Sequence, residues 1–200
     1  MKRLLILFAH PTPSKSRINR ALAAAVRQMD GVTFHDLYET YPDFFIDVKH
    51  EQKLLLEHDV VVLQHPFYWY STPAIMKQWE DLVLEHGFAY GEEGRALEGK
   101  QWLQVLSSGG GSEAYQTDGY NHFTIRQLLS PLEQTASLCR MVFLPPMVTA
   151  GTFRITDDEL KQQALRYRHV LEALRDERMD MVALKVHELM PAELPLISND

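Results

Sequence analysis

Short apolar runs alternate along the chain with segments in which apolar residues recur every three or four positions. A continuous apolar run predicts a strand covered on both faces, and a period near 3.6 predicts an amphipathic helix. The runs predict five strands, over residues 4–8, 32–37, 59–63, 102–106 and 141–144. The periodic segments predict five helices, over residues 17–30, 49–57, 73–83, 125–138 and 157–174.

Alternating strands and helices predict an α/β fold with an open parallel sheet and right-handed crossovers. Capping residues indicate where several helices begin. Ser16 and Thr72 are suited to cap helix N-termini, and Thr156 with Glu159 forms a capping box. The 200 residues fit one domain, which we place at 1–180. Periodicity fades from Met181, so residues 181–200 are expected to form a C-terminal tail.

Composition narrows the classes of partner. The net charge of −7 and the pI near 5.7 argue against a nucleic-acid binder and against binding to anionic membranes. The single cysteine, Cys139, permits no intrachain disulfide, which fits a reducing compartment. No apolar stretch reaches the roughly 18 residues that a membrane span needs, and residues 4–9 fit a first strand better than a signal peptide. We therefore expect a cytoplasmic protein.

In open parallel sheets, ligands bind at the carboxyl ends of the strands. The first loop there runs from His10 to Asn19 and ends on a helix N-terminus, where backbone N–H groups favour an anion. Hydroxyls of Ser14 and Ser16 would complete a phosphate cradle. An ordinary loop with Ser16 as a cap explains the same residues. The Walker A pattern is absent from the sequence, which disfavours ATP and GTP.

The second loop follows the third strand and holds four consecutive aromatic residues, from Phe67 to Tyr70. Packing alone explains poorly why a surface loop would expose them. A flat heteroaromatic ligand would use them for stacking, and a subunit interface is the alternative.

The third loop, Ser107 to Ser112, contains three glycines that let the backbone approach a ligand closely, or that form a flexible turn. Its loose match to the dinucleotide fingerprint follows the fourth strand instead of the first, so we discount it. Taken alone, each loop is weak or moderate evidence for a ligand site. The fold places all three at one edge of the sheet, and together they predict a ligand site.

Several ordered motifs resemble the NAD(P)H quinone oxidoreductase (DT-diaphorase) family. The resemblance covers roughly residues 3–175 and rests mainly on residues 51–79. Three further stretches, 9–11, 41–47 and 87–91, are similar to one branch, the ancillary flavoproteins of bacterial glutathione-gated potassium efflux systems. The resemblance implies a flavodoxin-like fold with strand order 2-1-3-4-5. It also implies a homodimer with one flavin per subunit, FMN first and FAD second.

The family's flavin contacts carry over by position. The resemblance implies that His10 and residues Ser16, Arg17, Ile18 and Asn19 hold the phosphate region. It implies that Pro66, Phe67, Tyr68, Trp69 and Tyr70 line the isoalloxazine, and that Ser107, Ser108, Gly109 and Gly110 meet its polar edge. The family usually has two threonines where this chain has Ser107 and Ser108. Tyr90 matches an aromatic residue that reaches the partner's site.

The implied reaction is a two-electron, ping-pong hydride transfer from NADH or NADPH to the flavin and then to a quinone. Tyr115 matches a family tyrosine, and His122, about one residue out of register with the family histidine, is its candidate partner in proton handling. A second function is regulation of a potassium efflux antiporter, which would bring the protein to the inner membrane as a peripheral subunit. A flavodoxin-like electron carrier and a flavin-free interaction module remain as alternatives. The resemblance implies no metal.

Overall fold

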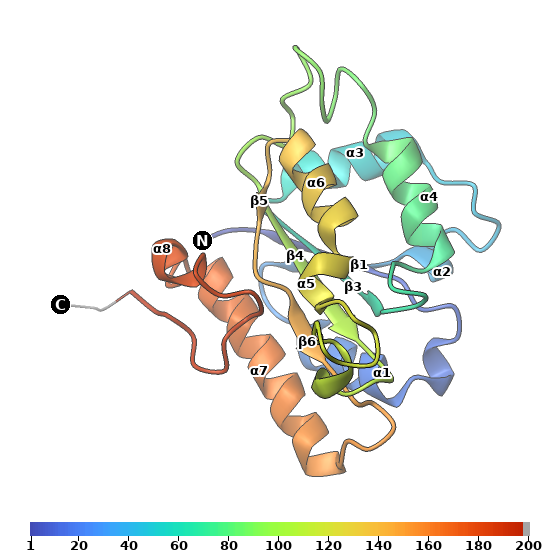
Figure 1. Ribbon diagram of the computed structural model, residues 1–200. Helices are drawn as coiled ribbons and strands as arrows, with labels where there is room; N and C mark the ends of the chain where they lie inside the picture. The colour runs from blue at the N-terminus through green and yellow to red at the C-terminus, as the bar shows by residue number, and fades with distance from the viewer. Residues whose placement is uncertain (198–200) are drawn as a thin grey trace.

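The computed structural model, which describes residues 1–197, is built on a parallel sheet of order β2-β1-β3-β4-β5 (Figure 1). This order confirms the predicted topology. Its first four strands along the chain are β1 (Leu4–Phe8), β2 (Val32–Asp36), β3 (Val60–Pro66) and β4 (Gln101–Ser107). Register pairs Phe8 with Gln64 and Pro66 with Ser107, so β1, β3 and β4 end near one another. The loops that follow them therefore leave from one edge.

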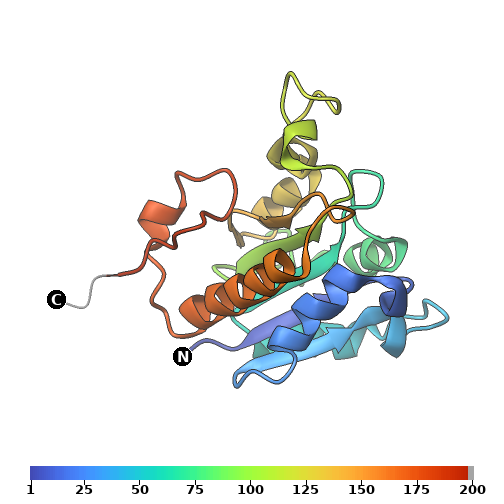
Figure 2. The same cartoon turned by 90° about the horizontal axis from the view of Figure 1, so that it is seen from below.

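Alternate strand residues pack into two separate cores, one on each face of the sheet. On one face, α1 (Arg17–Val26) and α7 (Asp157–Arg175) cover residues such as Leu4 and Val62. On the other, α3 (Val48–Glu57), α4 (Ala74–Val83) and α6 (Ser130–Leu138) cover residues such as Leu5 and Leu63. The view from below shows α1 and α7 side by side on one face (Figure 2). The central strands are buried on both faces, which explains their continuous apolar runs.

Two predicted elements are divided in the structure. The fifth strand becomes β5 (Val142–Phe143) and β6 (Met147–Thr149), which both pair with β4. Pro145 and Pro146 lie between them and have no N–H to donate to the ladder. The helix predicted over 125–138 becomes α5 (Ile125–Leu128) and α6, with a break at Leu129. Proline at position 131 is tolerated only in a first helical turn, which places the new start there.

A smaller difference concerns the start of α4. Pro73 is the N-cap residue and makes no side-chain capping bond, so Thr72 does not cap this helix. Short helices also occur: α2 (Leu37–Thr40), which Asp36 caps, the 3-10 turns η1 (Pro13–Lys15) and η2 (Ser112–Ala114), and α8 (Met181–Leu184). Within residues 1–197, no helix is long and apolar enough to cross a membrane.

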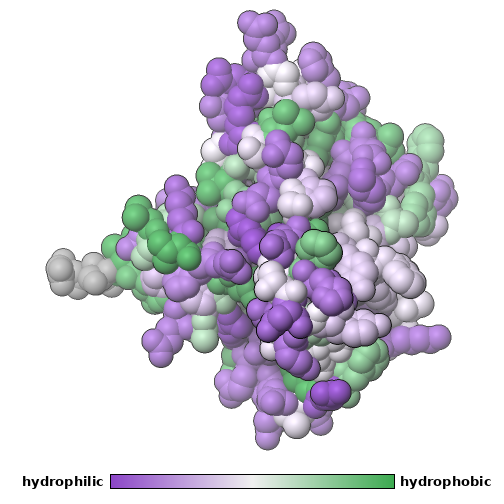
Figure 3. All heavy atoms as spheres, viewed as in Figure 1, coloured by the Kyte–Doolittle hydropathy of each residue, from purple (hydrophilic) through white to green (hydrophobic). Residues whose placement is uncertain are grey.

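The C-terminal segment packs against the domain beside α7 and the β5–β6 edge (Figure 1). Leu184 and Met190 are buried and belong to the core under α7. Hydrophobic side chains also gather on the outside of the segment around α8 (Figure 3), where Val182 in the helix and Val186 just after it are each 80% exposed. The segment thus has buried anchors and an exposed apolar side.

Candidate functional site

The three predicted loops meet at the carboxyl edge of the sheet. The side-chain amide of Asn19 donates a hydrogen bond of 2.8 Å to Ser107 Oγ, and the Phe67 N–H donates one of 2.8 Å to the Ser107 carbonyl oxygen. The rings of His10 and Tyr68 meet edge to face with their centroids 6.0 Å apart. The contacts join all three loops, as the topology predicted.

The first loop presents unpaired donors at the start of α1. Ser16 caps the helix by accepting a 3.2 Å hydrogen bond from the Asn19 N–H. Among residues 1–197, the N–H groups of Arg17 and Ile18 have no acceptor. Unpaired N–H groups at a helix start favour an anion. The capping role and the predicted anion-binding role of this loop are therefore compatible.

His10 lies at the end of β1 and is only 5% exposed. Burial lowers the pKa of its imidazole, which favours the neutral ring. The Thr12 N–H donates to Nδ1 at 3.1 Å, so the proton of the neutral ring is assigned to Nε2. His10 can thus donate from Nε2.

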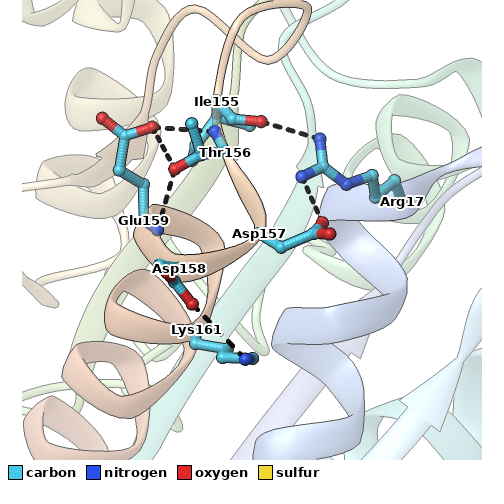
Figure 4. A network of polar contacts seen from close by, with 7 residues as sticks. All are labelled: Arg17, Ile155, Thr156, Asp157, Asp158, Glu159 and Lys161. Atoms are coloured by element: carbon cyan, nitrogen blue, oxygen red, sulfur yellow. Dashed lines mark hydrogen bonds and ion pairs between the residues drawn. The ribbon is translucent and has the colours of Figure 1, made fainter.

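The Arg17 side chain turns toward α7 (Figure 4). Its guanidinium donates to the Ile155 carbonyl oxygen at 2.8 Å and pairs with Asp157 at 2.6 Å. Both charged groups are well exposed, so the pair contributes little stability. The Arg17 guanidinium is thus engaged by α7 while its backbone N–H is free, and the phosphate contact by Arg17 stays a prediction.

The aromatic loop after β3 divides into a buried and an exposed part. Phe67 is 8% exposed and packs against Tyr115, with ring centroids 6.0 Å apart. Trp69 is 92% exposed, and Trp69 and Tyr70 hold φ angles of 50° and 63°. Such left-handed angles are uncommon for bulky residues. The Trp69 and Tyr70 N–H groups also have no acceptor within residues 1–197. Exposed rings beside free donors match the ligand-facing loop predicted from the sequence, and they also match an interface.

The glycine loop after β4 is buried at its start and partly or fully exposed from Gly109 to Ser112. A Cβ atom on Gly109 would lie 2.7 Å from Phe153 Cε2, and one on Gly110 would lie 3.2 Å from Tyr115 Cε2. The Ser108 N–H donates to the Thr149 carbonyl oxygen at 3.0 Å. The neighbouring Tyr115 ring, which is buried, favours glycine at position 110, whereas Gly109 meets only the edge of the exposed Phe153 ring.

Sequence reasoning missed the loop over residues 150–155 between β6 and α7. This loop and the glycine loop line an open hollow of about 690 Å³, and the Gly151 N–H donates to the Gly110 carbonyl oxygen at 2.9 Å. Phe153 is 89% exposed, and Gly151 has φ +68°. A glycine directly after an apolar strand was the available signal.

The two predicted proton-handling residues do not share a cavity. Tyr115 is 8% exposed, and burial raises the pKa of its phenol. His122 is exposed, has φ +58° and lines a different hollow with Tyr70 and Asn121. The Tyr70 hydroxyl donates to Asn121 Oδ1 at 3.1 Å. Asn121 thus takes the position next to the aromatic loop, and the role of His122 stays a prediction.

Tyr90 lies away from the three loops. It lines one part of a groove of about 430 Å³ beside α4 and α6, and Tyr70 and Ser71 line another. The groove connects the aromatic loop to the Gly87–Gly99 loop within one subunit. A contact of Tyr90 with a partner's site stays a prediction.

Residues 2–171 match a family model described as the flavodoxin-like fold, and the chain belongs to the flavodoxin-like NAD(P)H quinone reductase family. Its relatives include the glutathione-regulated potassium-efflux system ancillary protein KefG of Pectobacterium carotovorum. That protein is 49% identical over 165 residues, which are 82% of this chain and 90% of KefG.

Two solved structures are also similar. General stress protein 14 of Treponema denticola, in complex with FMN, has a TM-score of 0.83 and 39% identity, covering 86% of this chain and 99% of its own. An NADPH-quinone reductase from P. pentosaceus has a TM-score of 0.77 and 34% identity, covering 84% of this chain and 96% of its own. The motif resemblance to this family is thereby confirmed.

The donors and acceptors at the three loops suit a flavin mononucleotide. The free N–H groups at the start of α1 suit a phosphate. Asn19 Oδ1 is buried and has no donor within residues 1–197, so it can accept from a hydroxyl of a sugar alcohol chain. The exposed Trp69 ring offers a stacking face, and free loop N–H groups suit carbonyl oxygens of a flat heterocycle.

Proposed function

We propose that this protein is an FMN-dependent NAD(P)H:quinone oxidoreductase. The observation that carries the proposal is the meeting of a helix start with unpaired N–H groups, an exposed aromatic loop and a glycine loop at one edge of the sheet. The relative solved with FMN and the NADPH-quinone reductase of the same fold support it. The net reaction converts NAD(P)H, a proton and a quinone into NAD(P)⁺ and a hydroquinone.

FMN supplies the hydride chemistry when bound, and the protein binds and orients the reactants. Arg17 and Ile18 offer N–H groups to the phosphate, and the neutral His10 can donate from Nε2. Trp69 and Tyr70 offer rings and N–H groups to the flavin ring. Tyr115 keeps its phenol protonated, because burial raises its pKa, and can donate to a quinone oxygen.

The flavin assignment is tested on the purified protein. We expect denaturation to release FMN, identified by chromatography, with FAD as the second possibility. Reduction of the holoprotein by NADH and by NADPH, each followed by reoxidation with a quinone, then assigns the co-substrate. A protein that carries no flavin and binds neither FMN nor FAD when they are added refutes the proposal.

We propose in addition that the subunits form a homodimer whose shared sites include Tyr90. The groove beside α4 and α6 supports this, because it places a surface of mixed polarity, with leucines such as Leu84 and Leu138 beside charged residues, between the aromatic loop and Tyr90. Light scattering should give twice the mass of 23.1 kDa. Tyr90→Ala should then weaken FMN binding while leaving the fold intact. A strict monomer with full activity contradicts this proposal.

A second role is favoured by the KefG relatives, which are 44–49% identical. We propose that this protein also acts as an ancillary subunit of a glutathione-gated potassium efflux system. Potassium efflux from cells that carry such an antiporter should be faster with this protein than without it. A Tyr115→Phe variant, which loses one hydroxyl, separates the roles: we expect slower quinone reduction with efflux activation retained.

A further inference from the structure

The C-terminal residues 185–189 form an exposed span between two buried anchors. Leu184 is 1% exposed and Met190 is 3% exposed. The Met190 N–H donates to the Pro146 carbonyl oxygen at 2.9 Å, and Arg166 of α7 donates to the Met190 carbonyl oxygen. Pro146 directly precedes β6, so this anchor fixes the span beside the strand that pairs with the carboxyl end of β4.

This span closes one side of a cavity at Tyr115. Glu188 and Leu189 line a volume of about 130 Å³ together with Tyr115, Thr124, Ile125 and Val148. The aliphatic side chains, with Ala150, form an apolar wall, and five residues supply polar groups: Ser112, Tyr115, Gln116, Thr124 and Glu188. The match to the family model ends at residue 171, so Glu188 and Leu189 lie outside the part that defines the family.

We propose that residues 185–190 complete a subsite at Tyr115 that binds a single aromatic ring carrying a hydroxyl group. The volume fits one ring, because an apolar protein cavity of roughly 150 Å³ takes up benzene. The Glu188 carboxylate accepts hydrogen bonds and cannot donate them. At the position of Glu188 the cavity therefore favours a phenolic O–H over a quinone carbonyl, while the hydroxyls of Tyr115 and Thr124 can bond to either. In turnover, which rests on the proposed function, the subsite holds the hydroquinone end of the reduced acceptor.

Hydroquinone binding to the flavin-free full-length protein tests the subsite. Isothermal titration calorimetry compares the wild type with Leu189→Trp, which fills the cavity, and with Val186→Trp. Val186 lies in the same span, is 80% exposed and does not line the cavity. We expect Leu189→Trp to weaken binding by about tenfold or more, and Val186→Trp to leave it unchanged.

The role of Glu188 is tested with phenol and fluorobenzene, which are similar in size and differ in the O–H. The wild type should prefer phenol, and Glu188→Ala should reduce that preference. If Leu189→Trp lowers the unfolding temperature, Leu189→Ala replaces it, and loss of the apolar wall should weaken hydroquinone binding severalfold.

Equal hydroquinone binding by the wild type and Leu189→Trp overturns the subsite, and so does absence of binding by the wild type. The proposed function is tested separately, by assaying quinone reduction with the FMN-loaded wild type. If that protein reduces no quinone, the proposed function fails. A hydroquinone that binds the wild type and is excluded by Leu189→Trp supports the subsite even then.

Discussion

The Asn19 side-chain amide reaches from α1 across the end of β3 to the hydroxyl of Ser107 at the end of β4, with an N–O distance of 2.8 Å. The two side chains are 1% and 7% exposed. Gln64 of β3 donates to the Asn19 carbonyl oxygen at 3.2 Å. These buried bonds couple the predicted phosphate loop to the glycine loop.

We expect Asn19→Ala to lower the free energy of unfolding of the flavin-free protein by about 1–3 kcal/mol, because a buried hydroxyl loses its partner. FMN affinity should also fall. Urea unfolding and FMN titration measure the two effects. Ser107→Ala and the double variant complete a cycle, in which we expect a coupling of about 0.5–3 kcal/mol between the residues. Additive effects would show that the hydrogen bond contributes nothing of its own.

Trp69→Ala tests whether the aromatic loop faces a ligand. With 92% of Trp69 exposed, the substitution should change flavin-free stability by no more than about 0.5 kcal/mol. FMN binding or turnover should fall clearly. Phe67→Ala is the matched control, because Phe67 is 8% exposed and its loss should cost about 3–5 kcal/mol of stability. A collapse of the flavin-free unfolding temperature in Trp69→Ala would place that ring in the core.

The sequence predicted features that arise from local patterns. Leu4–Phe8 and Val60–Pro66 are buried on both faces, so their apolar runs reveal the parallel sheet and the loops that follow it. Long-range contacts leave no such pattern. Arg17 pairs with Asp157, 140 residues away, and Phe153 covers Gly109 only because β6 returns to β4. The direction of the Arg17 side chain was therefore beyond pattern reasoning, and for the loop over 150–155 the glycine at 151 could mark a turn but not its contact with the glycine loop.

The buried carboxyl of Glu80 should make the stability of the fold depend on pH. Glu80 is 7% exposed, and its Oε1 has no partner within residues 1–197. Burial raises the pKa of this carboxyl to about 7, and Lys77 partly offsets the shift. The folded state therefore binds the proton more tightly than the unfolded state, whose pKa is near 4.5. The stability that this proton contributes is complete below pH 4.5 and is lost as the pH rises through about 7.

Glu80→Gln keeps the shape and removes the ionisation. We expect equal stability of variant and wild type near pH 4.5, and a variant more stable by about 2–3 kcal/mol at pH 8. Asp81→Asn is the control, because that carboxylate is 60% exposed and should give no such gain. Denaturant unfolding across the pH range measures the difference. Parallel stability curves for Glu80→Gln and the wild type would contradict the buried, proton-binding state of Glu80.

The last prediction separates His122 from its neighbour Asn121. If His122 stabilises charge that develops during turnover, His122→Ala should slow the reaction toward the lower end of the roughly 10²–10⁴-fold range of general acid–base groups. Flavin content should stay unchanged. Asn121→Ala is the comparison, because Asn121 accepts the hydrogen bond from the Tyr70 hydroxyl at 3.1 Å. Its loss should disturb the aromatic loop and weaken FMN binding.

Stopped-flow kinetics resolve flavin reduction by NAD(P)H from reoxidation by a quinone. Under the proposed function the Tyr115 phenol donates to the quinone oxygen, so Tyr115→Phe, which removes only the hydroxyl, should slow reoxidation more than reduction. His122 is exposed and lines a hollow that Tyr115 does not line, so its part in the reaction is tested by itself. Unchanged rates for both steps in His122→Ala would remove this histidine from the mechanism and leave the flavin site standing.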